Sequence, residues 1–413
     1  MKKIIVFILL IITLTMLSGC KKINYEDDIA VMTEDMKLED FNYVIDTMDS
    51  LYPYWGELEE DGIEKEALQS EYLNKILETK DTIEFLNIVR QYFIDLNLGY
   101  GHLSYLGPQA YKSFTEIYKD SKPWKTVLFN KRSKAMYGAM NPDSGAFELA
   151  KDSLSADTNS EQSKYNEEEL KLELINDGTV MYIKCPSFEW NRAKSEPEKI
   201  IEFITKNQNC KNLIIDVRGN GGGSDNYWYD AFAIPNITED KTYSMYYLYT
   251  DETLHNNASK NYMKKRALLK KENTVDNLPA FESLSTNASN FDYFYPASAI
   301  IKAENEKALF QGDIYVLTDR ENASASATFI GFCKENKFAT LVGEASGGDE
   351  PYGDPALFAL PNSGLIFRFD LFYGLNTDGS SNGVSGVKPD IECDPAKALE
   401  VCIEQIYKKS KGK

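Results

Sequence analysis

The sequence predicts an α/β fold: a C-terminal core with a parallel or mixed sheet and crossover helices, preceded by a small helical N-terminal domain. An apolar run at 180–183 is followed by a helix-like segment at 197–206 and a second apolar run at 212–217. A strand, helix, strand order indicates a parallel pair with a right-handed crossover. The same alternation recurs between residues 314 and 342, and residues 36–98 carry apolar residues at helical spacing.

Length and charge limit the possible functions. The 413 residues leave room for two or three domains. The formal net charge of −19 argues against nucleic acid or an anionic membrane surface as the main partner, because like charges repel. No sequence pattern indicates a metal or another cofactor, so none is expected.

The N-terminus looks like an export signal. The apolar run at 4–17 follows two lysines and is shorter than the roughly 20 residues that span a membrane, so residues 1–19 are expected to be a signal peptide. The next residues, LSGC (17–20), resemble the cleavage and lipidation box of bacterial lipoproteins. This implies a diacylglycerol on Cys20, a tether over 20–35, and a lipid-anchored protein on the extracytoplasmic side of the cell membrane. An uncleaved anchor is the alternative, and it would also export the protein.

The other five of the six cysteines show no spacing that is typical of disulfides or of a metal site. Their number is odd and no CxxC spacing occurs, so neither a zinc site nor a set of disulfides is indicated. We expect most of them to be small buried apolar side chains.

Residues 36–105 are expected to form the helical domain. Helical spacing runs from Leu38 to Leu51, and two further helices are predicted at 67–79 and 83–98. The apolar faces of these predicted helices are expected to pack in the core, and their charged residues are expected to face solvent. The pattern therefore indicates no function.

The helical domain ends in LGYGHLSY (98–105), where two glycines beside His102 predict a turn that brings backbone close to another group. His102 is a candidate general base because imidazole titrates near neutral pH. A structural histidine is the alternative. The second histidine, His255, lies in a polar stretch and is a weaker candidate.

The rest of the chain divides into two regions. Residues 106–175 read as a connecting region, with a polar stretch at its end. Residues 176–413 form the predicted α/β domain, with an insertion at about 224–310 and a final helix beginning near Ala396. A basic helical segment at 258–271 is either a lid or a solvated helix.

A glycine-rich loop, RGNGGGS (218–224), follows the second core strand. Ligands of α/β folds bind at the carboxyl ends of parallel strands, and consecutive glycines let backbone N–H groups point at an anion. The loop lacks the GKS/T ending of a P-loop and the GxGxxG spacing of a dinucleotide fold. An oxyanion hole therefore fits better than a phosphate site, and a flexible turn is the structural alternative.

The segment NASASA (322–327) follows the strand-like run at 314–318 and opens a helix. A strand, a sharp turn and a helix can present a serine hydroxyl beside the unpaired N–H groups of a helix N-terminus. Those groups favour negative charge, such as the oxyanion of an attacked carbonyl. The alternative is a helix start rich in small, capping-prone residues.

Taken together, these motifs resemble the tail-specific, or C-terminal processing, serine peptidases, a family that also includes the tricorn protease core. They are IIDVRGNGGG (214–223), ASAS (323–326) and LVGEASGG (341–348), with GVKPD (386–390) resembling the family's C-terminal motif. The similarity covers roughly residues 176–395. It implies that Ser324, rather than Ser326, is the nucleophile, and that the backbone N–H groups of Ala325 and Gly222 form the oxyanion hole.

The family has two catalytic styles, and this sequence is closer to the second. Where the first places a lysine, this chain has Asp349, and no lysine lies between 337 and 388. The tricorn-like style uses an upstream histidine, which implies His102 as the base. That style also has a glutamate before the C-terminal motif, but none is present, so the orienting residue stays open between Asp378 and Glu344.

The function predicted from this resemblance is an exported serine peptidase that acts on peptides or proteins. Residues 106–172 show no PDZ-like carboxylate-binding loop, so recognition of a free C-terminus is not expected. Two alternatives remain: a non-catalytic binding lipoprotein on the same scaffold, and an esterase or other acyl hydrolase. The oligomeric state is left open.

Overall fold

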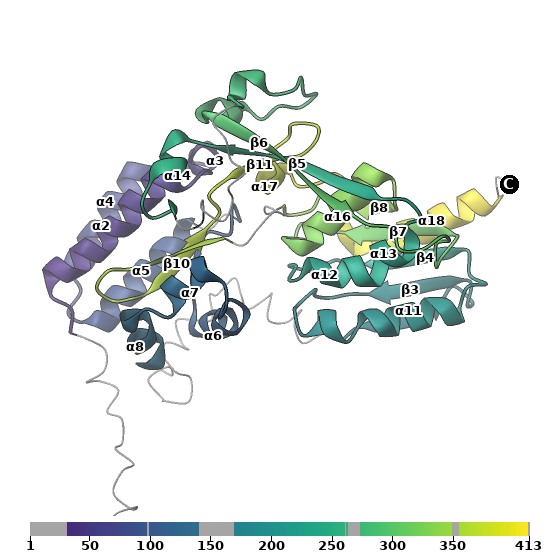
Figure 1. Ribbon diagram of the computed structural model, residues 1–413, viewed down its shortest axis with the longest axis horizontal. Coiled ribbons are helices and arrows are strands. Elements are labelled where there is room, and N and C mark those ends of the chain that lie inside the picture. The colour runs from purple at the N-terminus through teal and green to yellow at the C-terminus, as the bar shows by residue number, and fades with distance from the viewer. Residues whose placement is uncertain are drawn as a thin grey trace, which may run out of the picture.

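In the computed structural model the chain forms two lobes connected by long strands (Figure 1). N-terminal helices and strand β10 form one lobe, and strands β3, β4 and β7 with their helices form the other. The structure describes residues 31–96, 99–139, 169–260, 262, 273–348 and 355–411. Within these ranges no helix has the length and apolar character needed to cross a membrane.

Helices build most of the first lobe, as the spacing of apolar residues predicts. They are α2 (Glu34–Leu51), α3 (Trp55–Glu60), α4 (Lys65–Leu77), α5 (Thr82–Leu96), α6 (Pro108–Ile117), α7 (Lys122–Leu128) and α8 (Lys131–Ala139). Helix α2 begins after Thr33, whose hydroxyl accepts a hydrogen bond from the Met36 N–H. Its apolar residues Phe41, Val44 and Met48 are fully buried. The three helices from Pro108 onward lie in the region for which the sequence predicted no elements.

A small sheet from distant parts of the chain completes this lobe. Strands β1 (Ser104–Tyr105), β10 (Ile366–Phe369) and β9 (Ala356–Ala359) pair antiparallel in the order β1-β10-β9. The ring of Phe367 stacks on that of Phe93 in α5 at 5.3 Å between centroids. The late strands β9 and β10 thus pack with the N-terminal helices, although the sequence placed them in the C-terminal domain.

The second lobe contains the predicted parallel sheet, with an antiparallel strand at one edge. Its order is β12-β8-β7-β4-β3-β2, and only the β2–β3 pair is antiparallel. The strands are β2 (Lys171–Ile175), β3 (Val180–Lys184), β4 (Asn212–Asp216), β7 (Asp313–Thr318), β8 (Thr340–Gly343) and β12 (Ile391–Glu392). The α/β fold class is therefore confirmed.

Helices cover both faces of this sheet. Helix α18 (Ala398–Lys411) packs on one face, and α11 (Pro197–Lys206) and α16 (Ala325–Asn336) belong to the core of the other. Within α16, Phe329 is fully buried and its ring contacts those of Phe188, Trp228 and Phe232. Burying one such side chain contributes about 1.5–3 kcal/mol, so this packing fixes the start of α16 against the sheet.

The predicted insertion supplies the strands that connect the lobes (Figure 1). Strands β5 (Lys241–Tyr249) and β6 (Tyr293–Ile301) pair antiparallel over their full lengths, and β11 (Tyr373–Leu375) pairs with β5. The insertion also holds α12 (Asp225–Trp228), α13 (Ile234–Asn236) and α14 (Asp251–His255), and α17 (Asn382–Ser385) follows β11. The basic segment at 258–271 falls largely outside the described residues.

Candidate active site

Ser324 lies in a strained turn between β7 and α16. Its backbone has φ 52° and ψ −126°, a conformation that costs a non-glycine residue about 1–3 kcal/mol. The Ser324 N–H donates to the Gly348 carbonyl at 3.2 Å, and its carbonyl accepts from the Thr328 N–H at 2.9 Å. A serine held in such a strand-to-helix turn presents its hydroxyl outward.

The neighbouring Ser326 is placed differently. It is fully buried, and its hydroxyl oxygen accepts a hydrogen bond from Asn322 Nδ2 at 3.2 Å. Ser324, by contrast, is only half-buried. Of the two serines, Ser324 is therefore the one whose hydroxyl a substrate can reach.

The glycine loop lies directly against the serine turn. A Cβ added to Gly222 would come within 2.5 Å of the Ala323 carbonyl oxygen and 2.8 Å of Ser324 Cβ. It would also lie 2.9 Å from the Ala325 nitrogen, and Gly222 has φ 97°. Only glycine fits at this position, both because of the close approach and because of the backbone conformation.

Two side chains from the β7 end hold this loop in place. Both carboxylate oxygens of Asp319 accept from the Gly219 N–H, at 2.9 and 3.1 Å. Asn322 is fully buried, and its Nδ2 donates to the Val217 carbonyl while its Oδ1 accepts from the Asp319 N–H. Burial raises the pKa of Asp319 to about 6 despite these hydrogen bonds, so the carboxylate form that holds Gly219 predominates at neutral pH.

The two backbone N–H groups that are predicted to bind the oxyanion differ in their hydrogen bonds. Among the described residues none accepts a hydrogen bond from the Ala325 N–H, which is the first of helix α16. The Gly222 N–H donates to Asn220 Oδ1 at 2.8 Å. Asn220 is fully buried and its Nδ2 donates to the Cys185 carbonyl. The Ala325 N–H is thus able to donate a hydrogen bond to an oxyanion directly, whereas the Gly222 N–H already donates to another acceptor.

His102 is paired with a carboxylate that comes from the end of β10. Its Nδ1 lies 2.7 Å from Asp370 Oδ2, and the two side chains are 13% and 3% exposed. The Asp370 N–H also donates to the Gly101 carbonyl at 2.7 Å. His102 itself has φ 54°, so backbone and side-chain contacts together fix the orientation of its ring.

Tyr54 packs between the histidine segment and the serine segment. A Cβ on Gly101 would lie 2.7 Å from the Tyr54 ring, and one on Gly383 would lie 2.9 Å from the same ring. A Cβ on Gly348 would lie 2.0 Å from the carbonyl oxygen of the neighbouring Asn382. Because the Gly348 carbonyl accepts from Ser324, this set of contacts connects His102 to the nucleophile turn across the two lobes.

The model of peptidase family S41 matches residues 179–393, slightly more than half of the chain. The chain belongs to peptidase family S41. The family predicted from the motifs is thereby confirmed, and the protein is a serine-type peptidase that acts on peptides or proteins.

Solved structures share the fold of this S41 peptidase. A protein from Parabacteroides merdae described as a candidate peptidase is 18% identical, with TM-score 0.53, covering 89% of this chain and 96% of its own. Mature CPAF in complex with lactacystin is 13% identical, with TM-score 0.53 and coverages of 92% and 98%. At such identities the likeness concerns the fold. No curated protein sequence matches.

The sequence also suggested Asp378 and Glu344 as orienting residues of the S41 peptidase. Asp378 is exposed and accepts hydrogen bonds from the Ser380 N–H and hydroxyl within its own turn. Glu344 is exposed. The weaker histidine candidate, His255, is also exposed, and its Nε2 lies 3.8 Å from Asp251. Cys20 and Asp349 lie outside the described residues.

Sequence reasoning missed Asp370. One signal was present: this acid stands alone in the otherwise apolar and aromatic stretch FDLFYGL (369–375), and a buried carboxylate requires a partner. The partner is 268 positions away, so spacing along the chain could not reveal it.

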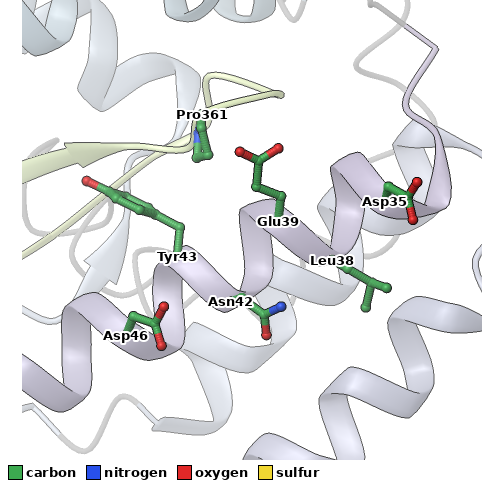
Figure 2. Close-up of a pocket in the computed structure, with 7 residues that line it drawn as sticks. All are labelled: Asp35, Leu38, Glu39, Asn42, Tyr43, Asp46 and Pro361. Atoms are coloured by element: carbon green, nitrogen blue, oxygen red, sulfur yellow. The ribbon is translucent and has the colours of Figure 1, made fainter.

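A surface hollow of about 580 Å³ lies elsewhere on the S41 peptidase, on helix α2 (Figure 2). Its lining residues are Asp35, Leu38, Glu39, Asn42, Tyr43, Asp46 and Pro361, and none belongs to the site. Within the described ranges no group of three or more His, Cys, Asp and Glu side chains is placed to hold a metal ion.

The contact at Gly222 predicts a large loss of activity for Gly222→Ala. The new methyl group would displace the glycine loop from Ser324 and Ala325, so we expect peptide hydrolysis to fall by about 100-fold or more in kcat/KM. Gly178→Ala is the matched control, because Gly178 also has positive φ (79°) but has nothing within 4 Å of the added Cβ. Comparable losses in both variants would show that backbone strain alone, rather than the contact with Ser324, is responsible.

Proposed function

We propose that this serine-type peptidase cleaves peptide bonds with Ser324 as nucleophile, His102 as general base and Asp370 as the residue that orients the imidazole. The observation that carries the proposal is the 2.7 Å contact between His102 Nδ1 and Asp370 Oδ2. A serine becomes nucleophilic when a base takes its proton, and the base acts best when a third group fixes its orientation.

The pair with Asp370 determines which imidazole nitrogen acts as the base. An ionised carboxylate only accepts hydrogen bonds, so Nδ1 carries the proton that is donated to Asp370. In this tautomer Nε2 is the unprotonated nitrogen, and it takes the Ser324 proton as Oγ attacks the carbonyl carbon. The imidazolium is stabilised by the buried carboxylate, and it returns the proton to the leaving amine before water hydrolyses the acyl-enzyme.

Backbone N–H groups stabilise the oxyanion that forms in this step. The Ala325 N–H is the donor with no other acceptor among the described residues, at the positive end of helix α16. Gly222 supplies the second N–H of the proposed hole, for which the oxyanion competes with Asn220 Oδ1. Losing one such donor typically costs about 100- to 1,000-fold in kcat.

The proposal includes export. The apolar segment and LSGC box at residues 1–20 support transport to the extracytoplasmic side, followed by lipid attachment at Cys20. Fully extended, the roughly 13 residues between Cys20 and helix α2 would reach at most ~45 Å.

The central test is labelling of the form that starts after Cys20 with a fluorophosphonate, which modifies activated serines. Wild type is expected to be labelled, whereas Ser324→Ala and His102→Ala lose labelling, because the first lacks the nucleophile and the second lacks the base. Ser326→Ala is the matched control and keeps it. Loss of labelling only in Ser324→Ala would remove His102 from the mechanism. An unlabelled but folded wild type would favour a non-catalytic binding protein.

The role of Asp370 predicts that Asp370→Asn lowers kcat about 1,000-fold with a smaller change in KM. The amide can donate to Nδ1, which would place the proton on Nε2 and leave no base for Ser324. Asp378→Asn serves as the control, because that exposed carboxylate bonds only within its own turn. The values of kcat and KM are measured for both variants by steady-state kinetics on one peptide. Equal kcat values in the two variants would contradict the role of Asp370.

Lipid attachment predicts that Cys20→Ser moves the full-length protein out of the membrane fraction. Without the Cys20 thiol no diacylglycerol can be added. A protein that carries fewer than two acyl chains binds a membrane only weakly. Fractionation of expressing cells, with incorporation of labelled palmitate, measures the change. Cys393→Ser is the control, and palmitate incorporation that persists in Cys20→Ser would exclude lipid attachment at this residue.

A further inference from the structure

Arg320 lies on the rim of the site, four residues before the nucleophile. Its Nη1 donates to the Ser346 carbonyl at 3.2 Å and its Nη2 donates to the Val384 carbonyl at 2.6 Å. Ser346 begins the stretch that leads to Gly348, the residue whose carbonyl accepts from Ser324. The guanidinium is thus oriented by the two loops that flank the serine turn, and its side chain remains exposed.

No carboxylate neutralises this guanidinium within the described part of the chain. The nearby Asp319 directs both oxygens to the Gly219 N–H, and Arg218 holds Asp216 in an ion pair of its own at 2.6 Å. A guanidinium has five N–H donors, and two groups of Arg320 are used on carbonyls. In a chain of net charge −19, an exposed arginine that has no acidic partner among the described residues is able to bind an anion.

Arg320 also lies close to the segment that carries the base. Burial and the Asp61 carboxylate raise the pKa of the Tyr100 hydroxyl to about 12, and the positive charge of Arg320 acts in the opposite direction. Tyr100 stands two residues before His102, and its ring stacks on Tyr54 at 6.1 Å between centroids. A group bound at Arg320 would therefore lie near both the loops that flank the serine turn and the segment of Tyr100.

We propose that Arg320 binds a carboxylate of the peptide substrate and so selects substrates with a negative charge near the cleaved bond. The guanidinium is planar and matches a carboxylate with two parallel hydrogen bonds. Because the Ser346 and Val384 carbonyls already orient it, little side-chain freedom is lost on binding. This inference rests on the proposed function of Ser324, and the carboxylate comes either from an acidic side chain or from the C-terminus.

The test uses four pools of randomised decapeptides. Two pools contain Asp and Glu, and two replace them with Asn and Gln; each type is made with a free and with an amidated C-terminus. Mass spectrometry follows cleavage by the form that starts after Cys20. We expect wild type to cleave a carboxylate-bearing pool about tenfold faster, the usual size of one charge-assisted pair, and Arg320→Gln to lose this preference.

The pools also identify the source of the carboxylate. A preference that survives amidation comes from acidic side chains, and one that follows the free terminus comes from the C-terminal carboxylate. Arg320→Lys should keep part of the preference, since it keeps the charge but loses the two parallel bonds. Arg132→Gln is the matched control, because Arg132 is exposed on α8 and its Nη1 bonds Asn362.

Binding to Ser324→Ala makes the test independent of catalysis. The same pools, now carrying a fluorescent label, are bound to Ser324→Ala and followed by fluorescence anisotropy. A carboxylate-bearing pool should bind about tenfold more tightly than the pool without it, and Ser324→Ala combined with Arg320→Gln should abolish the difference. If wild type is neither labelled nor active, the proposed function fails while this measurement still decides on Arg320. Equal binding of all pools, or a preference that persists without Arg320, would overturn the inference.

Discussion

The site depends on the close approach of Gly222 to the serine turn. Neighbouring parallel strands lie about 4.8 Å apart, so the loops that follow β4 and β7 emerge side by side at one edge of the sheet. A loop without side chains can then lie on Ser324 Cβ and the Ala325 nitrogen. The Asp319 carboxylate and the buried Asn322 amide connect the two loops, and these bonds offset the strain at Ser324.

The proposed base comes from the other lobe, so the geometry of the proposed site depends on packing between the lobes. Strand β1 pairs with β10 next to Asp370, and this pairing places His102 on its carboxylate. Tyr54 then packs against both segments, and its ring contacts Tyr373 of β11 at 5.0 Å. Because Tyr373 also bonds Glu57 of helix α3, the seam between the lobes is built from buried aromatic rings whose polar atoms are satisfied.

Local patterns in the sequence predicted those features that depend on neighbouring residues in the chain. The strand runs, the helix at 197–206 and the turn at Ser324 follow from apolar spacing and small residues. Asp370 and the return of β9 and β10 to the helical lobe depend on pairing over more than 200 positions. Likewise, no residue pattern shows that Asn220 occupies the Gly222 N–H.

The proposed Ser–His arrangement would distribute charge differently from a Ser–Lys dyad. A lysine acts as a base only when its surroundings lower its pKa strongly, whereas an imidazole needs an oriented ring and an acidic partner, here Asp370, which is 3% exposed. The histidine side thus carries the negative charge that stabilises the transferred proton. The serine side carries N–H donors and the exposed Arg320 guanidinium. During the proposed attack, the Ser324 proton therefore moves to His102, which is paired with Asp370, while the carbonyl oxygen develops its negative charge towards the N-terminus of α16.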